Sequence, residues 1–481
     1  MSIKRFFLDQ HGCAKNQVDG EIIIGILNAL GWNKTDTAET ADLIIINSCG
    51  FIEPAKKESI EAVLNARIAY PNAKILLAGC LAERYGTSLQ KDLPESDAFF
   101  GNGDLSQLPK IIDLLYPSSQ QNYNTSPIKQ KKDIKPFIKP PQHGVCSGAR
   151  PYILNFPRSA FIKITEGCNN NCTFCAIPII RGSVRSRPIL DIVNEIQEFI
   201  KKGYKEFNLI GQDLAVFEVD IDSTRDTPNR LSGLAQLLSA ISRLQGIFWV
   251  RLLYIHPDHY PLDILPIMIQ DNRFLPYFDI PFQSGSKKII HAMNRRGNAQ
   301  IYLNLVKSIK TAFSESNNPY GEAVIRTTFL TGFPGETEED FSETLTFLKD
   351  IQSLWSGVFT YSKEDGTQAA KIKPYVSKKI AEQRKKILND IQTTITNTML
   401  HRFYGKKFTV LIEEIFTHND KDECYMALGR AWFQAPEVDG SVVLNFAKGQ
   451  LDSEGSPLAP GSFIKVRITG IHGIDLEAAA V

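Results

Sequence analysis

Apolar and polar segments alternate regularly over the first part of the chain. Residues 4–10, 41–49 and 73–80 are expected to be strands, and residues 41–49 hold a continuous apolar run of the kind found in buried parallel strands. Residues 19–30 and 54–69 instead have the length and apolar spacing of helices. Strands that alternate with helices in this way predict a parallel sheet. The pattern therefore predicts an α/β domain over residues 1–116.

The segment from residue 117 to residue 150 interrupts the alternation. It is rich in Pro, Lys, Gln and Ser, which predicts a partly mobile linker. Its KQKK run is also compatible with an arm that binds nucleic acid, although a solvated tether fits such a run better.

The alternation resumes at residue 159 on a larger scale, with helical patterns such as residues 191–203 between the strands. Residues 377–404 form a longer polar helix. Each expected strand is followed by a polar or Gly-rich segment, which predicts a partial (β/α)6 barrel over residues 151–404 with its site at the carboxyl ends. The six expected strands span residues 159–165, 206–213, 248–257, 277–285, 323–336 and 357–367.

Residues 405–481 contain four short strand patterns separated by turn residues, which predicts a small β-barrel. This region carries 11 acidic and seven basic residues, a net charge of −4. Such a charge disfavours a phosphate backbone and suits a basic protein partner. The whole chain of 481 residues has a net charge of +1, so it has no general attraction for nucleic acid or membranes.

The start of the chain lacks the apolar core of a signal peptide, and no stretch approaches the roughly 20 apolar residues of a membrane span. We therefore expect a cytoplasmic protein without membrane contact. In a reducing compartment, disulfides are a poor explanation for its eight cysteines.

Three of these cysteines lie close together in the sequence CNNNCTFC, as Cys168, Cys172 and Cys175. Their spacing in a polar loop after a strand predicts a metal site, but it is not the paired spacing of a zinc ribbon. Cys146 in the linker is a possible fourth ligand. A 4Fe–4S cluster normally takes four thiolates, so one held by three keeps an iron open for an external ligand.

Three further cysteines, Cys13, Cys49 and Cys80, each follow one of the first three predicted strands. The carboxyl ends of parallel strands share one edge of a sheet, so these thiols are expected to meet there. Unrelated core cysteines are the alternative. Cys146 and Cys424 are interpreted as buried thiols.

Polar residues at other strand ends are candidates for binding a cofactor or substrate. Gly211, Gln212 and Asp213 end the second barrel strand and are predicted cofactor contacts, although turn formation also explains them. The Gly-rich run 330–337 permits close approach to a ligand. Catalytic residues are not identified. Arginines near the cysteine loop and residues after the sixth barrel strand are weaker candidates: Arg181, Arg185, Tyr361, Lys363 and Glu364.

The CNNNCTFC sequence resembles the CxxxCxxC signature of the radical S-adenosylmethionine (SAM) enzymes. That resemblance implies a 4Fe–4S cluster on Cys168, Cys172 and Cys175 whose open iron binds SAM. It also implies reductive cleavage of SAM to a 5′-deoxyadenosyl radical that abstracts hydrogen from carbon. By the same resemblance Phe174 lies beside the adenine of the cofactor, whereas packing at the barrel mouth explains it equally well.

The order of domains resembles that of the radical SAM methylthiotransferases over essentially the whole chain. The resemblance implies a second 4Fe–4S cluster on Cys13, Cys49 and Cys80, where sulfur is carried and methylated. It implies two SAM molecules per turnover, an electron donor such as flavodoxin or ferredoxin, and a TRAM-like terminal barrel that recognises substrate.

Several segments, among them residues 13–21, 47–60, 163–182, 325–337 and 429–440, resemble the RimO branch of this family. That branch adds a methylthio group to the β-carbon of an aspartate in small-subunit ribosomal protein twelve. The alternative is the MiaB branch, which modifies N6-isopentenyladenosine in tRNA and which the sequence PFQSGS (281–286) resembles more closely. The acidic terminal barrel makes tRNA the less expected partner. A non-catalytic iron–sulfur carrier is a further alternative.

Overall fold

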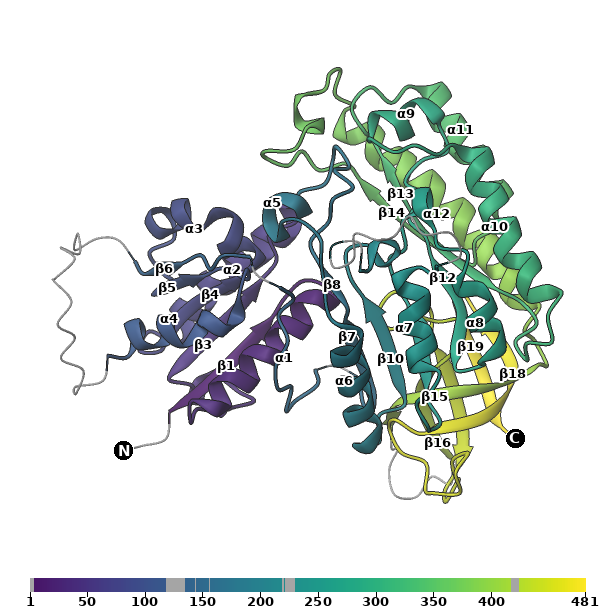
Figure 1. Ribbon diagram of the computed structural model, residues 1–481, viewed down its shortest axis with the longest axis horizontal. Helices are drawn as coiled ribbons and strands as arrows, with labels where there is room; N and C mark the ends of the chain where they lie inside the picture. Colours follow the sequence, from purple (N-terminus) through teal and green to yellow (C-terminus); the bar gives the residue numbers. More distant parts are fainter. Residues whose placement is uncertain are drawn as a thin grey trace.

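The protein is described here from a computed structural model that covers residues 4–117, 135–142, 144–154, 156–218, 220, 230–416 and 424–481. Two parallel sheets and a closed barrel follow one another along the chain (Figure 1). This confirms the predicted α/β class with a terminal β-barrel. None of the described helices is long and apolar enough to cross a membrane.

The N-terminal sheet has the strand order β2-β1-β3-β4-β5-β6, and all of its neighbouring strands are parallel. The predicted strands are present as β1, β3 and β4. The short strands β5 and β6 were not predicted, and β6 falls in the segment predicted as a linker, of which residues 118–134 and 143 lie outside the described residues. The strands are β1 (Arg5–Gln10), β2 (Asn33–Lys34), β3 (Leu43–Ser48), β4 (Lys74–Gly79), β5 (Ala98–Phe100) and β6 (Phe137–Ile138).

Helices cover both faces of this sheet. Helices α1 and α4 contribute to a core that also includes the inner face of the next sheet, whereas α2 and α3 pack on the opposite face. The four helices are α1 (Ala14–Ala29), α2 (Glu53–Ala69), α3 (Cys80–Asp92) and α4 (Leu108–Leu115).

Helix α1 begins at Ala14, five residues before the predicted helix at residues 19–30. Its first turns carry polar side chains that are nonetheless buried, among them Lys15, Asn16 and Asp19. These residues lie against the first barrel strand, where Asp19 pairs with Lys163. Because the buried face is polar here, the apolar pattern gave no sign of the helix start.

The central sheet has the order β14-β13-β12-β11-β10-β7 and is parallel throughout, which is the predicted six-stranded partial barrel. Helices line its outer face (Figure 1), and a short antiparallel pair, β8 (Thr165–Glu166) and β9 (Arg185–Ser186), lies beyond β7. The barrel strands are β7 (Ser159–Lys163), β10 (Glu206–Ile210), β11 (Trp249–Leu252), β12 (Phe274–Asp279), β13 (Val324–Thr331) and β14 (Trp355–Thr360). The helices are α5 (Ile177–Arg181), α6 (Ile189–Lys201), α7 (Gly233–Ile241), α8 (Ile264–Gln270), α9 (Lys287–Ala292), α10 (Ala299–Ser314), α11 (Glu338–Ile351) and α12 (Lys378–His401).

The terminal barrel is closed in the order β15-β16-β17-β19-β18. Four of its strands were predicted, whereas β19 was missed because only two residues in its DLEAAA sequence, Leu476 and Ala478, reach the core. The strands are β15 (Lys407–Phe416), β16 (Cys424–Ala431), β17 (Val442–Ala447), β18 (Phe463–His472) and β19 (Asp475–Ala480).

Buried charges join the terminal barrel to the amino ends of the central strands. Glu206, the first residue of β10, accepts hydrogen bonds from Arg430 at 2.7 Å and from Arg251 at 3.3 Å. All three side chains are fully buried. Burial would raise the pKa of Glu206, but Arg430 and Arg251 hold that pKa well below its ordinary value. The carboxylate is therefore charged and is shared by both arginines, while Arg430 also pairs with Glu413.

We predict that Glu206→Gln lowers the free energy of unfolding by about 3–5 kcal/mol, because it leaves two buried arginines without their shared carboxylate. Denaturant unfolding measures the change. The difference from wild type should shrink below about pH 4, where the wild-type carboxylate begins to be protonated in the unfolded chain. As a control, Glu198→Gln breaks an exposed pair with Lys201 and should change little. Equal effects of the two changes would contradict this reading.

Candidate functional site

The structure places the three N-terminal thiols at one edge of the first sheet. Cys13 follows β1, Cys49 follows β3, and Cys80 follows β4 directly. Glycines allow the backbones to converge there: a Cβ atom on Gly12 would lie 3.2 Å from Cβ of Cys49, and one on Gly50 would lie 2.7 Å from the Cys80 carbonyl oxygen. The edge is thus built for close approach of these thiols.

The three thiols also interact electrostatically. The pKa of Cys49 is raised to about 12, chiefly by burial and in part by the neighbouring Cys80. Burial also raises the pKa of Cys80. For Cys13, burial acts in the same direction, but Lys15 and Arg181 outweigh it and lower the pKa. The Cys13 side chain is exposed, whereas that of Cys80 is buried.

Polar side chains that the sequence analysis did not identify surround Cys80. Its Sγ donates to Asn16 Oδ1 at 3.2 Å and accepts from Asn102 Nδ2 at 3.3 Å. Arg181 Nη2, from the central domain, lies 3.3 Å from the same sulfur. Their position after strand ends was the only sequence signal for the two asparagines.

The second set of thiols lies in the loop between β8 and α5. Gly167 (φ +76°) begins this loop, and a Cβ atom there would lie 2.1 Å from the Ser183 carbonyl oxygen. Backbone hydrogen bonds fold the loop onto itself, from Cys175 N to Cys172 O and from Cys168 N to Gly182 O, both at 3.0 Å.

Burial raises the pKa of Cys168 to about 11 and that of Cys175 to about 12. Cys172 adds to both shifts, so the three thiols are electrostatic neighbours. A bound cation would reverse these shifts, since metal coordination favours the thiolate.

Asp213, a predicted cofactor contact, is occupied by protein groups. It accepts hydrogen bonds from Asn170 Nδ2 at 2.7 Å, from His259 Nε2 at 2.7 Å, and from the backbone N–H groups of His256 (3.1 Å) and Ala215 (2.9 Å). Burial opposes ionisation, but His259 lowers its pKa overall. Asp213 thus ties the cysteine loop, through Asn170, to the ends of two barrel strands.

The other predicted cofactor contacts, Gly211, Gln212 and Phe174, have fewer hydrogen bonds to protein groups than Asp213 has. Both polar atoms of Gln212 are buried, with no hydrogen-bond partner among the described residues. A Cβ atom on Gly211 would lie 2.1 Å from Thr165 Oγ1, an atom that is also buried and without a partner in the described part of the chain. Phe174 is half-buried and packs against an apolar cluster with Met293 and Phe333. The unpaired atoms leave room for hydrogen bonds to a polar ligand.

Arg181 lies in a buried group of four charges between the two domains. It pairs with Asp19 at 3.0 Å and with Glu166, and Lys163 pairs with both of these carboxylates. It comes six residues after Cys175 in the chain and touches Cys80. Arg181 therefore holds the segment that follows the cysteine loop against one of the N-terminal thiols.

The remaining candidate residues form hydrogen bonds, ion pairs or ring contacts with other protein groups. Arg185 donates to backbone oxygens, among them Gly144 O. Glu364 accepts from Lys56 (3.1 Å) and Arg84 (2.7 Å) of the N-terminal domain. Lys363 lies over the Tyr375 ring, Tyr361 packs on Phe333, and Gly332 in the Gly-rich run 330–337 donates to Glu336.

The two cysteines interpreted as buried thiols are placed as follows. Cys146 is half-buried, and burial raises its pKa to about 11. Cys424 begins β16, and its side chain lies outside the described residues.

Two buried cations near the thiols were also missed by the sequence analysis. Arg295 acts electrostatically on Cys168 and Cys175, and its guanidinium donates to the backbone oxygens of Pro281 and Phe282. Lys15 lies beside Cys13 with its Nζ over the Tyr254 ring. Burial lowers the pKa of Lys15. Each set of thiols therefore has a buried cation close by.

The described residues contain no group of three His, Cys, Asp or Glu side chains arranged around a single metal ion. A four-iron cluster is wider than one ion, so its thiolates stand farther apart. Soft thiolate donors in threes, with cations nearby, fit an iron–sulfur cluster better than a hard metal ion.

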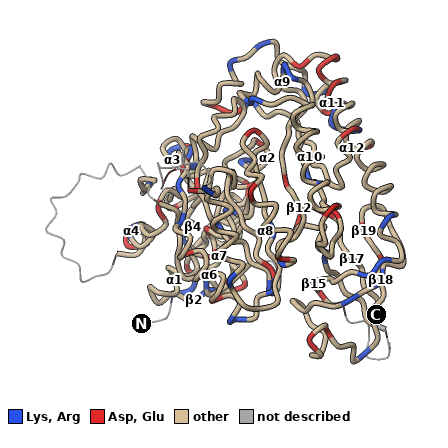
Figure 2. Tube along the Cα trace, turned by 45° about the vertical axis from the view of Figure 1, so that its right-hand side comes forward, with Lys and Arg blue, Asp and Glu red and all other residues tan. Residues whose placement is uncertain are grey.

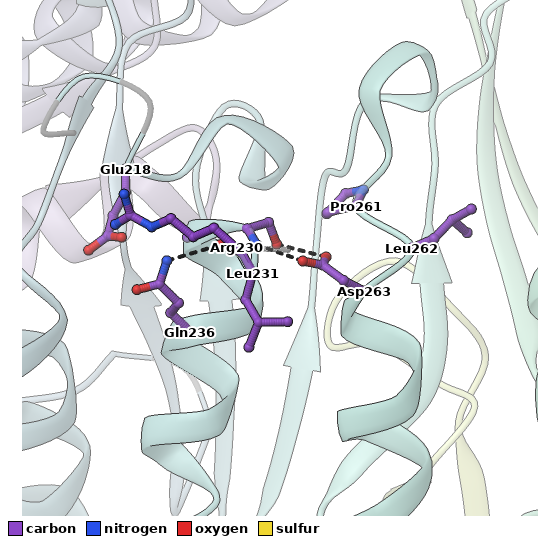
Figure 3. A pocket seen from close by; sticks show the side chains of 9 residues that line it. Glu218, Arg230, Leu231, Gln236, Pro261, Leu262 and Asp263 are labelled. Carbon is purple, nitrogen blue, oxygen red and sulfur yellow. Dashed lines mark hydrogen bonds between the residues drawn. The ribbon is translucent and has the colours of Figure 1, made fainter. Parts of the chain in front are cut away.

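A cavity of 370 Å³ lies away from the thiols, beside the loops after β10 and β11 (Figure 3). Its lining includes Ser232, whose N–H and hydroxyl donate to Asp263 at 2.6 and 2.8 Å, and Gln236, which donates to the Leu231 carbonyl. None of the predicted site residues lines it.

Known families match three successive parts of the chain. They are described as Uncharacterized protein family UPF0004 (residues 5–101), Radical SAM superfamily (162–348) and TRAM domain (405–481). A protein of Treponema denticola named Ribosomal protein uS12 methylthiotransferase RimO is 58% identical over 98% of this chain and 100% of its own.

The chain belongs to the RimO family. RimO proteins of Aquifex aeolicus and Thermotoga maritima are 36% and 35% identical over 97% and 98% of this chain, and over 94% and 98% of their own. As in other radical SAM proteins, the chemistry of this family uses an iron–sulfur cluster and SAM.

Among solved structures, the radical SAM methyltransferase TsrM of Kitasatospora setae has a similar fold. The structure with tryptophan and a SAM analogue has a TM-score of 0.53 and 10% identity over 87% of this chain and 79% of its own. At this identity the likeness concerns the fold alone.

We predict that Asp213→Asn loosens the cysteine loop, because an amide in its place would turn a donor toward groups that themselves donate. The variant should lose about 1–3 kcal/mol of unfolding free energy and hold less iron per chain after anaerobic reconstitution. Asp263→Asn is a matched control, since Asp263 also accepts two hydrogen bonds but lies at the remote cavity. If both variants retain the same iron, Asp213 does not organise the loop.

Proposed function

We propose that this protein adds a methylthio group to the β-carbon of an aspartate in ribosomal protein uS12. Its similarity over nearly the full chain to RimO proteins supports this function. The observation that carries the proposal for this chain is the packing of the segment after the cysteine loop against Cys80, where Arg181 donates to the Cys80 sulfur.

The residues divide into two sites under this proposal. Cys168, Cys172 and Cys175 hold a 4Fe–4S cluster whose open iron takes SAM, and Gln212 and Thr165 supply hydrogen bonds to that ligand. The same proposal includes Gly211 and Phe174 as cofactor neighbours. Cys13, Cys49 and Cys80 hold a second 4Fe–4S cluster. When bound, the first cluster with SAM supplies a hydrogen-abstracting radical, and the second supplies the methylthio sulfur.

The protein itself positions and encloses these groups. Asp213 and His259 fix the loop that carries the first set of thiols. Arg181 donates to Cys80 and keeps α5 against the N-terminal sheet. Enclosure of the thiols between two domains keeps water away from reactive species. We also propose two SAM molecules per turnover and a flavodoxin or ferredoxin as electron donor.

Charge favours a protein substrate over tRNA. The terminal barrel region has a net charge of −4, which repels a phosphate backbone. Elsewhere acidic and basic residues are interspersed (Figure 2), so recognition of a basic ribosomal protein depends on local contacts. The tRNA-modifying and non-catalytic alternatives are not favoured.

The decisive experiment compares uS12 from cells with and without this gene by mass spectrometry. We expect an increment of about 46 Da on one aspartate, as one SCH3 group replaces hydrogen, and its loss in the deletion strain. Unchanged uS12 together with a lost methylthio group on tRNA nucleosides would overturn the substrate assignment.

The two cysteine sets should behave differently when mutated. Cys172→Ala is expected to abolish 5′-deoxyadenosine production from SAM, since the first cluster cannot be held. Cys49→Ala should leave that production measurable but stop methylthiolation of uS12. Both products are measured by mass spectrometry in anaerobic assays, and the two variants serve as controls for each other. Methylthiolation by Cys49→Ala protein would refute the role of the N-terminal thiols.

A further inference from the structure

Lys15 is a buried cation in an unfavourable position. It is the second residue of α1, two positions after Cys13, and only 9% of its surface is exposed. The first turn of a helix carries the positive end of the helix dipole, which disfavours a cation there. Removing an ammonium group from water is also costly unless a negative group compensates it.

The described residues provide no such compensation by a carboxylate. No carboxylate among them lies within ion-pair distance of Lys15 Nζ. Apart from Cys13, the negative groups that act on it electrostatically are Asp279 and Glu166. Asp279 already pairs with Arg326 at 3.2 Å, and Glu166 pairs with Lys163 at 2.7 Å and with Arg181. These acids are therefore committed to other cations.

The contact that Lys15 does make is with an aromatic ring. Its Nζ lies 3.7 Å from the ring centre of Tyr254, which follows β11 at the mouth of the central barrel. Tyr254 has φ of +69°, a left-handed conformation that is strained for a bulky residue, and its carbonyl oxygen accepts from Leu214 N at 3.0 Å. A conformation of this kind is typical of functional sites, and here it holds the ring beneath the ammonium group.

The exposed side chain of Cys13, two residues before Lys15, leaves open space at this edge of the sheet. Cys13 is exposed, and it interacts electrostatically with both Lys15 and Tyr254. An anionic group that enters this space would meet a buried ammonium with no carboxylate partner in the described chain. The proposed substrate residue, an aspartate, carries such a group on the carbon next to the one that is modified.

We propose that Lys15 is a specificity-determining residue that binds the side-chain carboxylate of the target aspartate and so places its β-carbon beside the N-terminal thiols. The inference rests on the proposed function and deepens it. This contact would make the enzyme select aspartate over asparagine, because an amide cannot replace the charge of the carboxylate.

The test measures binding and turnover of two uS12 peptides, one with the target aspartate and one with asparagine in its place, by the reconstituted full-length enzyme. Wild-type enzyme should bind the aspartate peptide about ten- to hundredfold more tightly, the range expected for a charged hydrogen bond. Lys15→Gln should remove this preference, with KM for the aspartate peptide raised and binding of the asparagine peptide nearly unchanged. Lys15→Arg should retain most of the preference.

Lys4→Gln is the matched control, because Lys4 also lies over an aromatic ring (Tyr116, 4.1 Å) but is exposed and distant from the thiols. It should keep the wild-type preference. If wild-type enzyme binds the aspartate and asparagine peptides equally well, that result alone overturns the inference, and no variant is needed. So does a Lys15→Gln enzyme that loses iron or weakens both peptides equally, since Lys15 would then serve the cluster or the fold. If wild-type enzyme leaves the aspartate peptide unmodified, the proposed function fails and this inference fails with it.

Discussion

The arrangement of this protein depends on four buried charges between its first two domains. Asp19 on α1 and Glu166 on β8 alternate with Lys163 on β7 and Arg181 on α5, and each acid contacts both cations. Buried ion pairs of this kind add little net stability compared with apolar packing, but losing one partner is costly, because it leaves an unpaired buried charge. Here these pairs fix how the first two domains pack, and therefore which side of the N-terminal sheet faces the cysteine loop. Arg181 also contacts Cys80.

Other buried charges close the remaining sides of the molecule. Glu21 pairs with Arg150, which also reaches Glu195, and Glu364 pairs with Arg84 and Lys56. At the opposite end, the buried pair of Glu206 with Arg430 joins the central strands to the terminal barrel, which covers their amino ends. The thiols thus lie at the carboxyl ends of the strands, while the terminal barrel covers the amino ends of the central strands (Figure 1).

Sequence patterns predicted the parts of this fold that depend on local periodicity. The parallel strands, the six-stranded partial barrel and the closed terminal barrel all follow from runs of apolar residues. The start of α1 and strand β19 were missed, because polar residues in the first and small residues in the second do not give the usual signal.

The site was predictable only in outline. Cysteine spacing and strand ends indicated both sets of thiols, whose role as cluster ligands stays a prediction. The side chains around them come from distant parts of the chain: Asp19 meets Lys163, Lys15 meets Tyr254, and Asn102 meets Cys80. Periodicity says nothing about such pairings, because they depend on how whole domains pack. Asp213 was identified as a cofactor contact from its position, whereas its four hydrogen bonds are all to protein groups.

Diffraction at the iron absorption edge, from crystals of the anaerobically reconstituted protein, tests the central claim most directly. Two iron clusters are expected on either side of Arg181, one at Cys13, Cys49 and Cys80 and the other at Cys168, Cys172 and Cys175, with the Asp19–Arg181 pair intact. Iron at only one of these sets, or domains turned so that Arg181 no longer reaches Cys80, would contradict the account.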